Sequence, residues 1–370
     1  MTKLASAVES ISPAFARTKR LLFQPFRFGL WARLAVVALI TGEAGGGSGG
    51  GSSIPNFNQH QSQGGENHWA AAANPFSEGW EQIQPYMGWV VVGVVLALAV
   101  VVLWIYSDCV YRFILLDAVV SGRCRLREGW RRWRAAGRRY FLWVISFGLV
   151  QFVLVGTVAG IPLLLAYRAG WFEHPDQHLG GLIGWGLLLA LVVIALVVVL
   201  AVIDMLGRDF LVPVIACEEV GAMDGWERLL AIMSAEKSAY AVYVLMKIVL
   251  AMAGGIIFAI LDLIVILVLL IPLGLLALAG YLIGSGLGIS WDISTQLLLG
   301  GVGLLVIAGI LYVVGFVYAP GLVFFQSYTV EFFAPRYGPL GNKMFPPSLP
   351  GTPASMPPGQ ILQPPESSPA

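Results

Sequence analysis

The sequence predicts an all-α fold, a polytopic transmembrane helix bundle. Hydrophobic residues make up 58% of the 370 residues and charged residues 12%, with a mean hydropathy of +0.79. This composition is too apolar for a soluble globule. A membrane-spanning helix needs about 20 residues, and several apolar runs of the chain are that long. Nine arginines gather from Arg112 to Arg139, between two such runs. A bilayer core does not accept that charge, so the positive-inside rule predicts a cytoplasmic segment here.

The chain begins with a basic segment, residues 1–27, whose only acid is Glu9, and we expect it in the cytoplasm. The following apolar run, about 28–42, is short for a span. A signal peptide is the alternative, but the basic region continues to Arg33 and no A-x-A cleavage site directly follows the run. We therefore expect a first span here. Residues 43–86 are rich in glycine and polar residues and lack Lys and Arg, which predicts a flexible outer loop.

The rest of the chain alternates between apolar runs and polar connections. We expect residues 168–181 to form an outer loop and residues 207–239 to form a second cytoplasmic elbow. Gly156 and Gly160 form a GxxxG pair, which would permit close approach of another helix. The later spans are expected at about 87–106, 140–167, 182–203, 240–263 and 297–318.

One apolar tract, residues 239–287, is too long for a single span, since as one helix it would measure about 74 Å. We expect it to break near Pro272 and Gly274. The extra apolar segment at 265–287 is then either a full span or a re-entrant piece on the outer side. Six spans are preferred, which places the C-terminus in the cytoplasm. The Pro-rich tail, residues 334–370, is expected to be disordered.

The two cytoplasmic elbows look like copies of one unit. Arg112-Phe113 with Gly129-Trp130 in the first matches Asp209-Phe210 with Gly225-Trp226 in the second. The segment from Pro320 to Glu331 looks like a truncated third copy. Repeated span–elbow–span units predict a single transmembrane domain, residues 28–333, rather than two domains.

Three motifs carry a resemblance to known proteins: Phe210 with Gly225-Trp226, Leu245-Met246-Lys247, and Pro-x-x-Val-Phe-Phe-x-x-Tyr at 320–328. On these residues the chain, over most of 20–340, resembles uncharacterised polytopic membrane proteins of bacteria and archaea. Its architecture is similar to the membrane region attached to some glycerophosphodiester phosphodiesterases. The resemblance implies a bacterial cytoplasmic (inner) membrane protein and carries no assigned chemistry. Gln326 stands where it implies a basic residue.

The first elbow is a candidate lipid-binding surface. Leu126, Trp130, Trp133 and Gly137 share one face at helical spacing, and arginines cover the rest. This pattern is typical of a helix that lies in the membrane surface, attracted to anionic lipid by about 1 kcal/mol per basic residue. Alternatively, the arginines only enforce topology. The candidate lipid-contact residues are Arg123, Arg125, Arg127, Trp130, Arg131, Trp133 and Arg134.

The second elbow is acidic by comparison, with five acids and two bases between Glu218 and Lys237. Anionic headgroups would repel it, so we hypothesise that the two elbows dock on each other, with Arg131 and Arg132 near Glu227. The alternative is that each elbow has its own solvated face.

Ionisable residues within spans are functional candidates by default. Asp204, Lys247 and Asp262 are such residues. Asp204, at the inner boundary, could pair with Lys247 on the neighbouring helix. Asp262 lies about 22 Å along a helix from Lys247, so it is expected near the outer interface, where it could mark an ion or proton step.

The remaining sequence offers no cofactor, metal or catalytic site. The four histidines, His60, His68, His174 and His178, all fall in predicted outer loops, so no haem or pigment ligand is expected inside the bundle. The three cysteines lack CxxC spacing, so neither zinc nor a disulfide is expected. There is no HExxH, GxSxG, P-loop or nucleotide fingerprint, which speaks against an enzyme.

These observations favour a non-catalytic membrane protein, a structural, assembly or accessory subunit of a larger complex. The expected partners are anionic lipid and other membrane subunits, not nucleic acid. A small-solute or ion transporter or channel is the alternative, and a membrane-embedded lipid enzyme is disfavoured.

Overall fold

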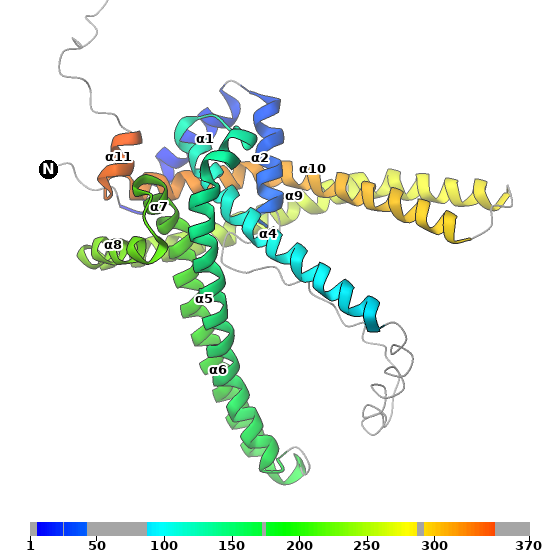
Figure 1. The fold of residues 1–370 in the computed structure, drawn as a ribbon, viewed down its shortest axis with the longest axis horizontal. Coiled ribbons are helices and arrows are strands. Elements are labelled where there is room, and N and C mark those ends of the chain that lie inside the picture. The colour runs from blue at the N-terminus through cyan, green and yellow to red at the C-terminus, as the bar shows by residue number, and fades with distance from the viewer. Residues whose placement is uncertain (1–5, 25, 43–86, 172–174, 287–291, 345–370) are drawn as a thin grey trace, which may run out of the picture.

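The computed structural model describes residues 6–24, 26–42, 87–171, 175–286 and 292–344. Within these ranges every regular element is a helix (Figure 1), which confirms the predicted all-α class. The elements are α1 (Ile11–Phe23), α2 (Phe28–Ile40), α4 (Met87–Ser121), α5 (Leu126–Arg168), α6 (Pro175–Leu206), the π-helix η4 (Gly207–Leu211), α7 (Val212–Glu218), α8 (Ala222–Ala235), α9 (Lys237–Gly286), α10 (Ile293–Phe333) and α11 (Gly338–Met344).

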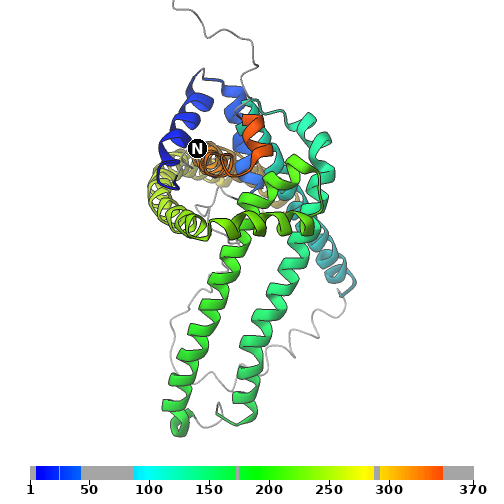
Figure 2. The same cartoon turned by 90° about the vertical axis from the view of Figure 1, so that its left-hand side faces the viewer.

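The helices meet in one compact region, which we call the hub, and their outer parts leave it as three arms (Figures 1 and 2). The hub contains α1, α2, α7, α8 and α11 with the adjoining ends of the long helices. The arms are residues 87–104 of α4, the α5–α6 hairpin over 148–199, and the α9–α10 hairpin over 248–313. No described residue of the arms is buried.

This architecture differs from the single packed bundle that was expected. The three arms diverge from the hub, and the two hairpins point in different directions (Figure 1). The physical reason is that the arms are apolar all round, so no face is set apart for burial. Within lipid there is also no hydrophobic drive that would bring such helices together.

The hub core is largely aromatic. Phe210 is fully buried, and its ring centroid lies 4.9 Å from that of Tyr243 and 5.0 Å from that of Phe333. Phe113 is buried in the same cluster and contacts Tyr140 at 6.1 Å between centroids. Because α4, α5, η4, α9 and α10 each contribute rings, this core exists only where all of these helices meet.

The internal repeat predicted from the elbows has a structural counterpart. Phe113 and Phe210, the matched phenylalanines, are both fully buried. The matched glycines pack in the same way: a Cβ on Gly129 would lie 3.0 Å from Ile114, and a Cβ on Gly225 would lie 2.8 Å from Leu211. In each copy the glycine therefore lets its helix approach the residue that follows the buried phenylalanine.

The arginine-rich segment is almost wholly helical, as the face pattern of the first elbow predicts. Its first part ends α4, the turn at Gly122 has a positive φ of 69° that suits glycine, and the remainder starts α5. The first elbow and the span predicted at 140–167 are thus one helix of 43 residues. Arginine is a good helix former, so a long basic stretch can continue directly into an apolar one.

Five helical stretches are long and apolar enough to cross a membrane: Val90–Ser121, Leu126–Arg168, Gly180–Glu218, Lys237–Leu282 and Thr295–Phe333. The first predicted span, at 28–42, corresponds to α2, which has 13 residues and so falls short of the about 20 that a span needs. It packs within the hub, where Leu34, Ala35, Val37 and Ala38 are buried.

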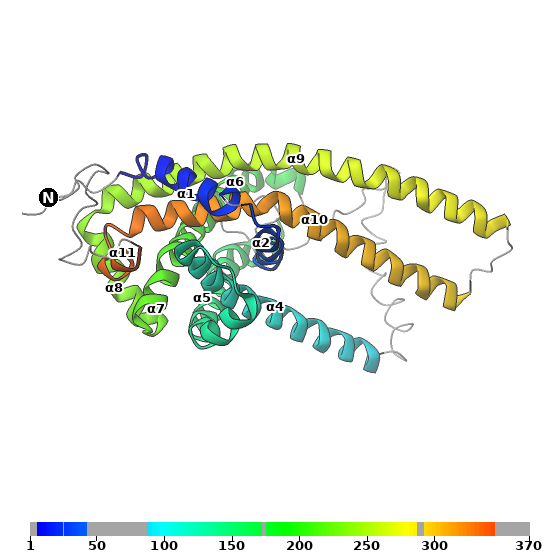
Figure 3. The ribbon, with the colours of Figure 1, turned by 90° about the horizontal axis from the view of Figure 1, so that it is seen from above.

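The predicted break at Pro272 and Gly274 is wrong, because α9 runs unbroken for 50 residues with Pro272 inside it. A proline removes only one hydrogen-bond donor, and apolar helices in membranes tolerate it. The span at 240–263 and the extra segment at 265–287 therefore belong to one helix, which extends beside α10 (Figure 3).

A Cβ on Gly156 or Gly160 would have no neighbour within 4 Å, so the close helix approach that the GxxxG pair permits is not made within the described chain. The prediction of a disordered tail is corrected for its first part: Gly338–Met344 form α11, and Leu340 is buried against the hub. The predicted loop at 43–86 and the tail from residue 345 lie outside the described residues.

Gly137 offers a test of the hub packing. A Cβ at this position would lie 2.6 Å from Val110 Cγ2 and 3.2 Å from Val110 Cα, so α4 and α5 would have to separate. We expect Gly137→Ala to destabilise the protein by about 1–3 kcal/mol, measured as thermal unfolding in detergent. The matched control is Gly148→Ala, also on α5, where nothing lies within 4 Å. An equal effect of both substitutions would contradict this packing.

Candidate functional site

A π-helical turn places the charged residue Asp209 inside the hub. The π-helix η4 joins α6 to α7, and such turns are rare and frequent at functional sites. A Cβ on Gly207, its first residue, would lie 2.6 Å from the Trp143 ring, so the turn can pack here only because this residue is glycine. Two residues later, Asp209 is 7% exposed.

Asp209 forms a buried ion pair with Lys247 of α9. The Lys247 Nζ lies 2.6 Å from Asp209 Oδ1 and 2.5 Å from Oδ2, and Lys247 is only 5% exposed. The Tyr243 hydroxyl donates to Asp209 Oδ2 at 3.0 Å and lies 2.8 Å from Thr329 Oγ1. The carboxylate thus receives hydrogen bonds from two residues of α9, and Tyr243 extends the network to α10.

Two more ion pairs lie beside this one. Arg112 pairs with Asp108 on α4, with 3.1 Å between Nη2 and Oδ1. Arg208, at the start of η4, pairs with Asp204 on α6. Both pairs have i,i+4 spacing, which places the two side chains on the same face of a helix. With Asp209 and Lys247, the group holds three cations and three carboxylates, so its formal charges balance.

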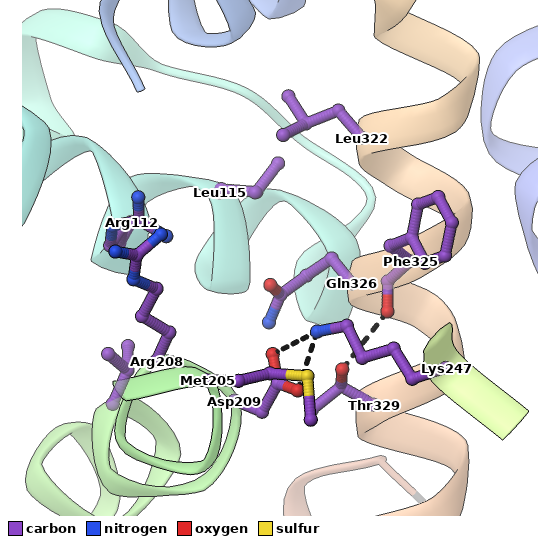
Figure 4. A pocket seen from close by; sticks show the side chains of 11 residues that line it. Arg112, Leu115, Met205, Arg208, Asp209, Lys247, Leu322, Phe325, Gln326 and Thr329 are labelled. Carbon is purple, nitrogen blue, oxygen red and sulfur yellow. Dashed lines mark hydrogen bonds and ion pairs between the residues drawn. The ribbon is translucent and has the colours of Figure 1, made fainter. Parts of the chain in front are cut away.

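A small cavity lies inside this charge cluster (Figure 4). Its volume is about 30 Å³, and it is lined by residues of α4, α6, η4, α7, α9 and α10. Arg112 and Asp209, the matched positions of the two repeat copies, both line it, as does Gln326 from the proposed third copy. That volume suffices for about one water molecule and is far below the about 300 Å³ at which organic ligand pockets begin.

The chemistry open to this site is therefore limited. Its charges neutralise one another, and its cavity has room for water but not for an organic substrate. A buried carboxylate that is fully paired and hydrogen-bonded fixes the geometry of the helices around it. The cluster thus has the features of an internal joint between helices.

The expected pairing of Asp204 with Lys247 is wrong. Lys247 pairs with Asp209, and Asp204 pairs with Arg208. The sequence places Asp209 in the second elbow, because it follows the predicted end of the span at 182–203. The signal that could have identified it is the repeat, which matches Asp209 with Arg112: in both copies a charge precedes a buried phenylalanine.

Asp262 lies midway along α9, not at its outer end. The Tyr318 hydroxyl of α10 donates to Asp262 Oδ2, and Tyr318 is 6% exposed. This contact joins the two helices of the third arm near its base. It is separate from the charge cluster, since Asp262 does not line the cavity around Asp209.

The candidate lipid-contact residues divide into two groups. Trp133 is buried and stacks on Phe113 at 5.8 Å between centroids, and Trp130 is half-buried against Tyr106 and Tyr111. The apolar face of this helix thus lies against α4 rather than open to lipid. The arginines of the set form the exposed surface; they are Arg123, Arg125, Arg127, Arg131 and Arg134.

The two elbows contact each other, but through other residues than those expected. Arg139 donates to the backbone carbonyl oxygen of Glu219, and the rings of Trp143 and Trp226 lie 5.6 Å apart. In the described chain no ion pair joins Arg131 or Arg132 to Glu227. The contact thus depends on a carbonyl group and on ring packing rather than on complementary charge.

The described residues contain no group of three or more His, Cys, Asp or Glu arranged to hold a metal ion. Of the four histidines, His60, His68 and His174 lie outside the described residues, and the side chain of His178 is not described.

Comparison with known proteins gives one result. Residues 5–341 match the model of a family described as a family of unknown function (DUF7544). No curated protein and no solved structure matches the chain.

The buried ion pair predicts a large effect of single substitutions. Asp209→Ala leaves Lys247 buried without its counter-charge and should cost about 3–5 kcal/mol of stability, and Lys247→Met should have a similar cost. The double variant should lose less than the sum of the two. Thermal unfolding of the four proteins measures this cycle. The control is Glu128→Ala, which breaks the exposed Arg125–Glu128 pair and should leave the unfolding temperature unchanged. If the effects of Asp209→Ala and Lys247→Met are strictly additive in the double variant, the pairing is contradicted.

Cys124, in the turn between α4 and α5, gives a pH-dependent test. Burial raises the pKa of its thiol to about 11, and only the thiolate attacks an alkylating reagent. The alkylation rate should therefore still rise about tenfold per pH unit at pH 9, where a free cysteine with a pKa near 8.5 begins to level off. Peptide mass spectrometry after iodoacetamide treatment measures the rate. A plateau below pH 9 would show that this turn is open to solvent.

Proposed function

We propose that this chain, which belongs to the DUF7544 family of unknown function, is a non-catalytic integral membrane protein that serves as a structural, assembly or accessory subunit of a larger membrane complex. The observation that supports this most is the contrast between the hub and the arms. Three ion pairs of the hub lie around a cavity of about 30 Å³, whereas the arms expose apolar side chains along their whole length.

The arms are suited to contact other apolar surfaces. Phe152 on α5 is 77% exposed, Leu187 on α6 is 72% exposed and Leu305 on α10 is 74% exposed. A soluble protein would bury such residues. In a membrane they can contact lipid or the helices of another subunit, and three arms that point in different directions present surfaces for lateral association on several sides.

The basic segments of the chain gather in the hub, on one side of the arms. The arginine-bearing start of α5, the second elbow, α1 and α11 all belong to the hub, whereas the last turn of α5 and the first turn of α6 lie at the far end of their arm (Figure 2). We propose that the hub faces the cytoplasm of a bacterial inner membrane, with both termini on that side. Six crossings would then require the short α2 to act as one of them.

The exposed arginines support contact with anionic lipid. Arg127 and Arg138 are both exposed on α5, and basic residues near an anionic surface each add about 1 kcal/mol of attraction. The similarity in architecture to the membrane region of some glycerophosphodiester phosphodiesterases stays a prediction from the three sequence motifs, and it carries no activity to this chain.

A transporter is the second candidate, because Asp209 and Lys247 are buried charges next to a water-sized cavity. Such residues can pass a proton or an ion between the two sides of a membrane. Liposomes that contain the purified protein and an internal pH dye distinguish the two functions. We expect no flux above that of empty liposomes under a pH gradient; a flux that Asp209→Asn abolishes would favour the transporter.

Photo-crosslinking in native membranes tests the proposed association. A photoreactive amino acid replaces Phe152, Leu187 or Leu305 on the arms, and replaces Met223 in the control, which is 75% exposed on α8 of the hub. We expect protein adducts of discrete mass from at least one arm position and a different pattern from Met223. If every arm position labels lipid alone and the protein leaves the membrane as a single chain, the subunit proposal is wrong.

A further inference from the structure

A second groove in the hub differs from the charge cluster in size and in sign. It has a volume of about 380 Å³ and lies between the start of α2 and the turn that joins α4 to α5. Four of the residues that line it are arginines, and none is acidic; the arginines are Arg27, Arg33, Arg123 and Arg125. Two come from the N-terminal segment and two from the arginine-rich segment, which lie about 90 residues apart in the chain.

The walls of this groove are held in place by hydrogen bonds. Arg33 donates from Nη1 to the backbone carbonyl oxygen of Cys124 at 2.7 Å. Trp31 donates from its indole nitrogen to the carbonyl oxygen of Leu22 at 3.0 Å, which fixes the approach of α1 to α2. Gly122, with its positive φ of 69°, makes the turn on the opposite wall. The arginines are thus brought together by the fold.

The charges of the groove are incompletely balanced. Arg125 pairs with Glu128 at 2.8 Å, but no carboxylate in the described chain forms an ion pair with Arg27 or Arg123. Helix α2 begins at Phe28, next to Arg27, and the amino end of a helix carries partial positive charge. The groove therefore carries a net positive charge, which favours the binding of an anion.

The size and the chemistry of the groove suit a phosphate group. A volume of about 380 Å³ is within the usual range for small ligands. Arginine binds phosphate through two parallel N–H···O bonds and keeps its charge at any physiological pH. The groove therefore offers several donors to one polyanionic group from at least two sides.

Exposed aromatic residues beside the groove point to a lipid as the source of that phosphate. Phe26 is 61% exposed and Phe28 is 67% exposed, on either side of Arg27 in the chain. Aromatic rings next to arginines are typical of segments that lie at the headgroup level of a bilayer. A free phosphate ion would gain nothing from these rings, whereas a phospholipid would place its acyl chains against them.

We propose that this groove is a specific binding site for the phosphate headgroup of an anionic phospholipid. The site rests on the proposed function in one respect, since the groove must lie at the level of the headgroups. It also adds a specific ligand to that function. The arginines of the groove bind the headgroup of one lipid molecule, whereas the other exposed arginines attract the anionic membrane surface as a whole.

Lipid titration of the purified full-length protein tests the site. Native mass spectrometry counts the phosphatidic acid molecules bound in detergent, with phosphatidylcholine as the neutral comparison. The double variant Arg27→Gln/Arg123→Gln removes two charges from the groove. We expect it to weaken the tightest phosphatidic acid site by at least about tenfold, because charged hydrogen bonds to phosphate are lost. Arg33 is left unchanged, since it holds Cys124.

The matched control is Lys19→Gln/Arg20→Gln. It removes the same charge from exposed positions of α1 that do not line the groove. We expect less than a twofold effect, with unfolding temperatures of both variants close to that of the parent protein. Equal weakening by the two double variants would overturn the specific site and leave a general attraction to anionic lipid.

Inorganic phosphate distinguishes the two sources of the ligand. We expect millimolar phosphate to compete with phosphatidic acid while binding far more weakly itself, because it lacks acyl chains. If phosphate alone binds as tightly as the lipid, the lipid assignment is wrong. The proposed subunit function is tested separately by crosslinking from the arms, so a failure of the groove and a failure of that function give different results.

Discussion

The ion pair between Asp209 and Lys247 is the interaction on which the rest of the structure depends. Asp209 lies on η4, which follows the second arm, and Lys247 lies on α9, which forms part of the third arm. The Tyr243 hydroxyl donates to the same carboxylate and also contacts Thr329 of α10. Separating these helices would leave charges unpaired in an apolar interior, at a cost of several kcal/mol. The arms can therefore differ in direction while their bases stay joined.

The hub and the arms differ in what covers their apolar side chains. In the hub, aromatic rings such as Phe210 and Tyr240 are buried by protein, and tight contacts require glycine at Gly137 and Gly207. Along the arms, apolar side chains face outward in every direction, and the glycines at 156 and 160 touch nothing. Packing in the hub resembles that of a soluble core, whereas the arms have the surface of a protein whose solvent is lipid.

The sequence predicts the helical class, the elbow repeat and the basic surface, because these depend on composition and on matched residues such as Phe113 and Phe210. It does not predict contacts between distant segments. Arg17 pairs with Glu331 at 2.7 Å, and nothing local to either residue indicates the other. The burial of Asp209 depends on the π-helix, whose extra residue per turn leaves no mark in hydrophobic periodicity. The direction of the arms likewise depends on the packing at their bases.

The arms also differ in length, and this has a consequence for the surrounding bilayer. The α4 arm measures about 27 Å, each helix of the α5–α6 arm about 31 to 38 Å and the α10 part of the third arm about 31 Å, whereas the α9 part reaches about 58 Å at 1.5 Å per residue. A hydrocarbon layer of about 30 Å therefore matches the α10 part but not the whole of the α9 part. Because the Tyr318 hydroxyl holds Asp262 against α10, the base of α9 would carry its apolar surface past the hydrocarbon boundary, where local thickening of the bilayer can cover it.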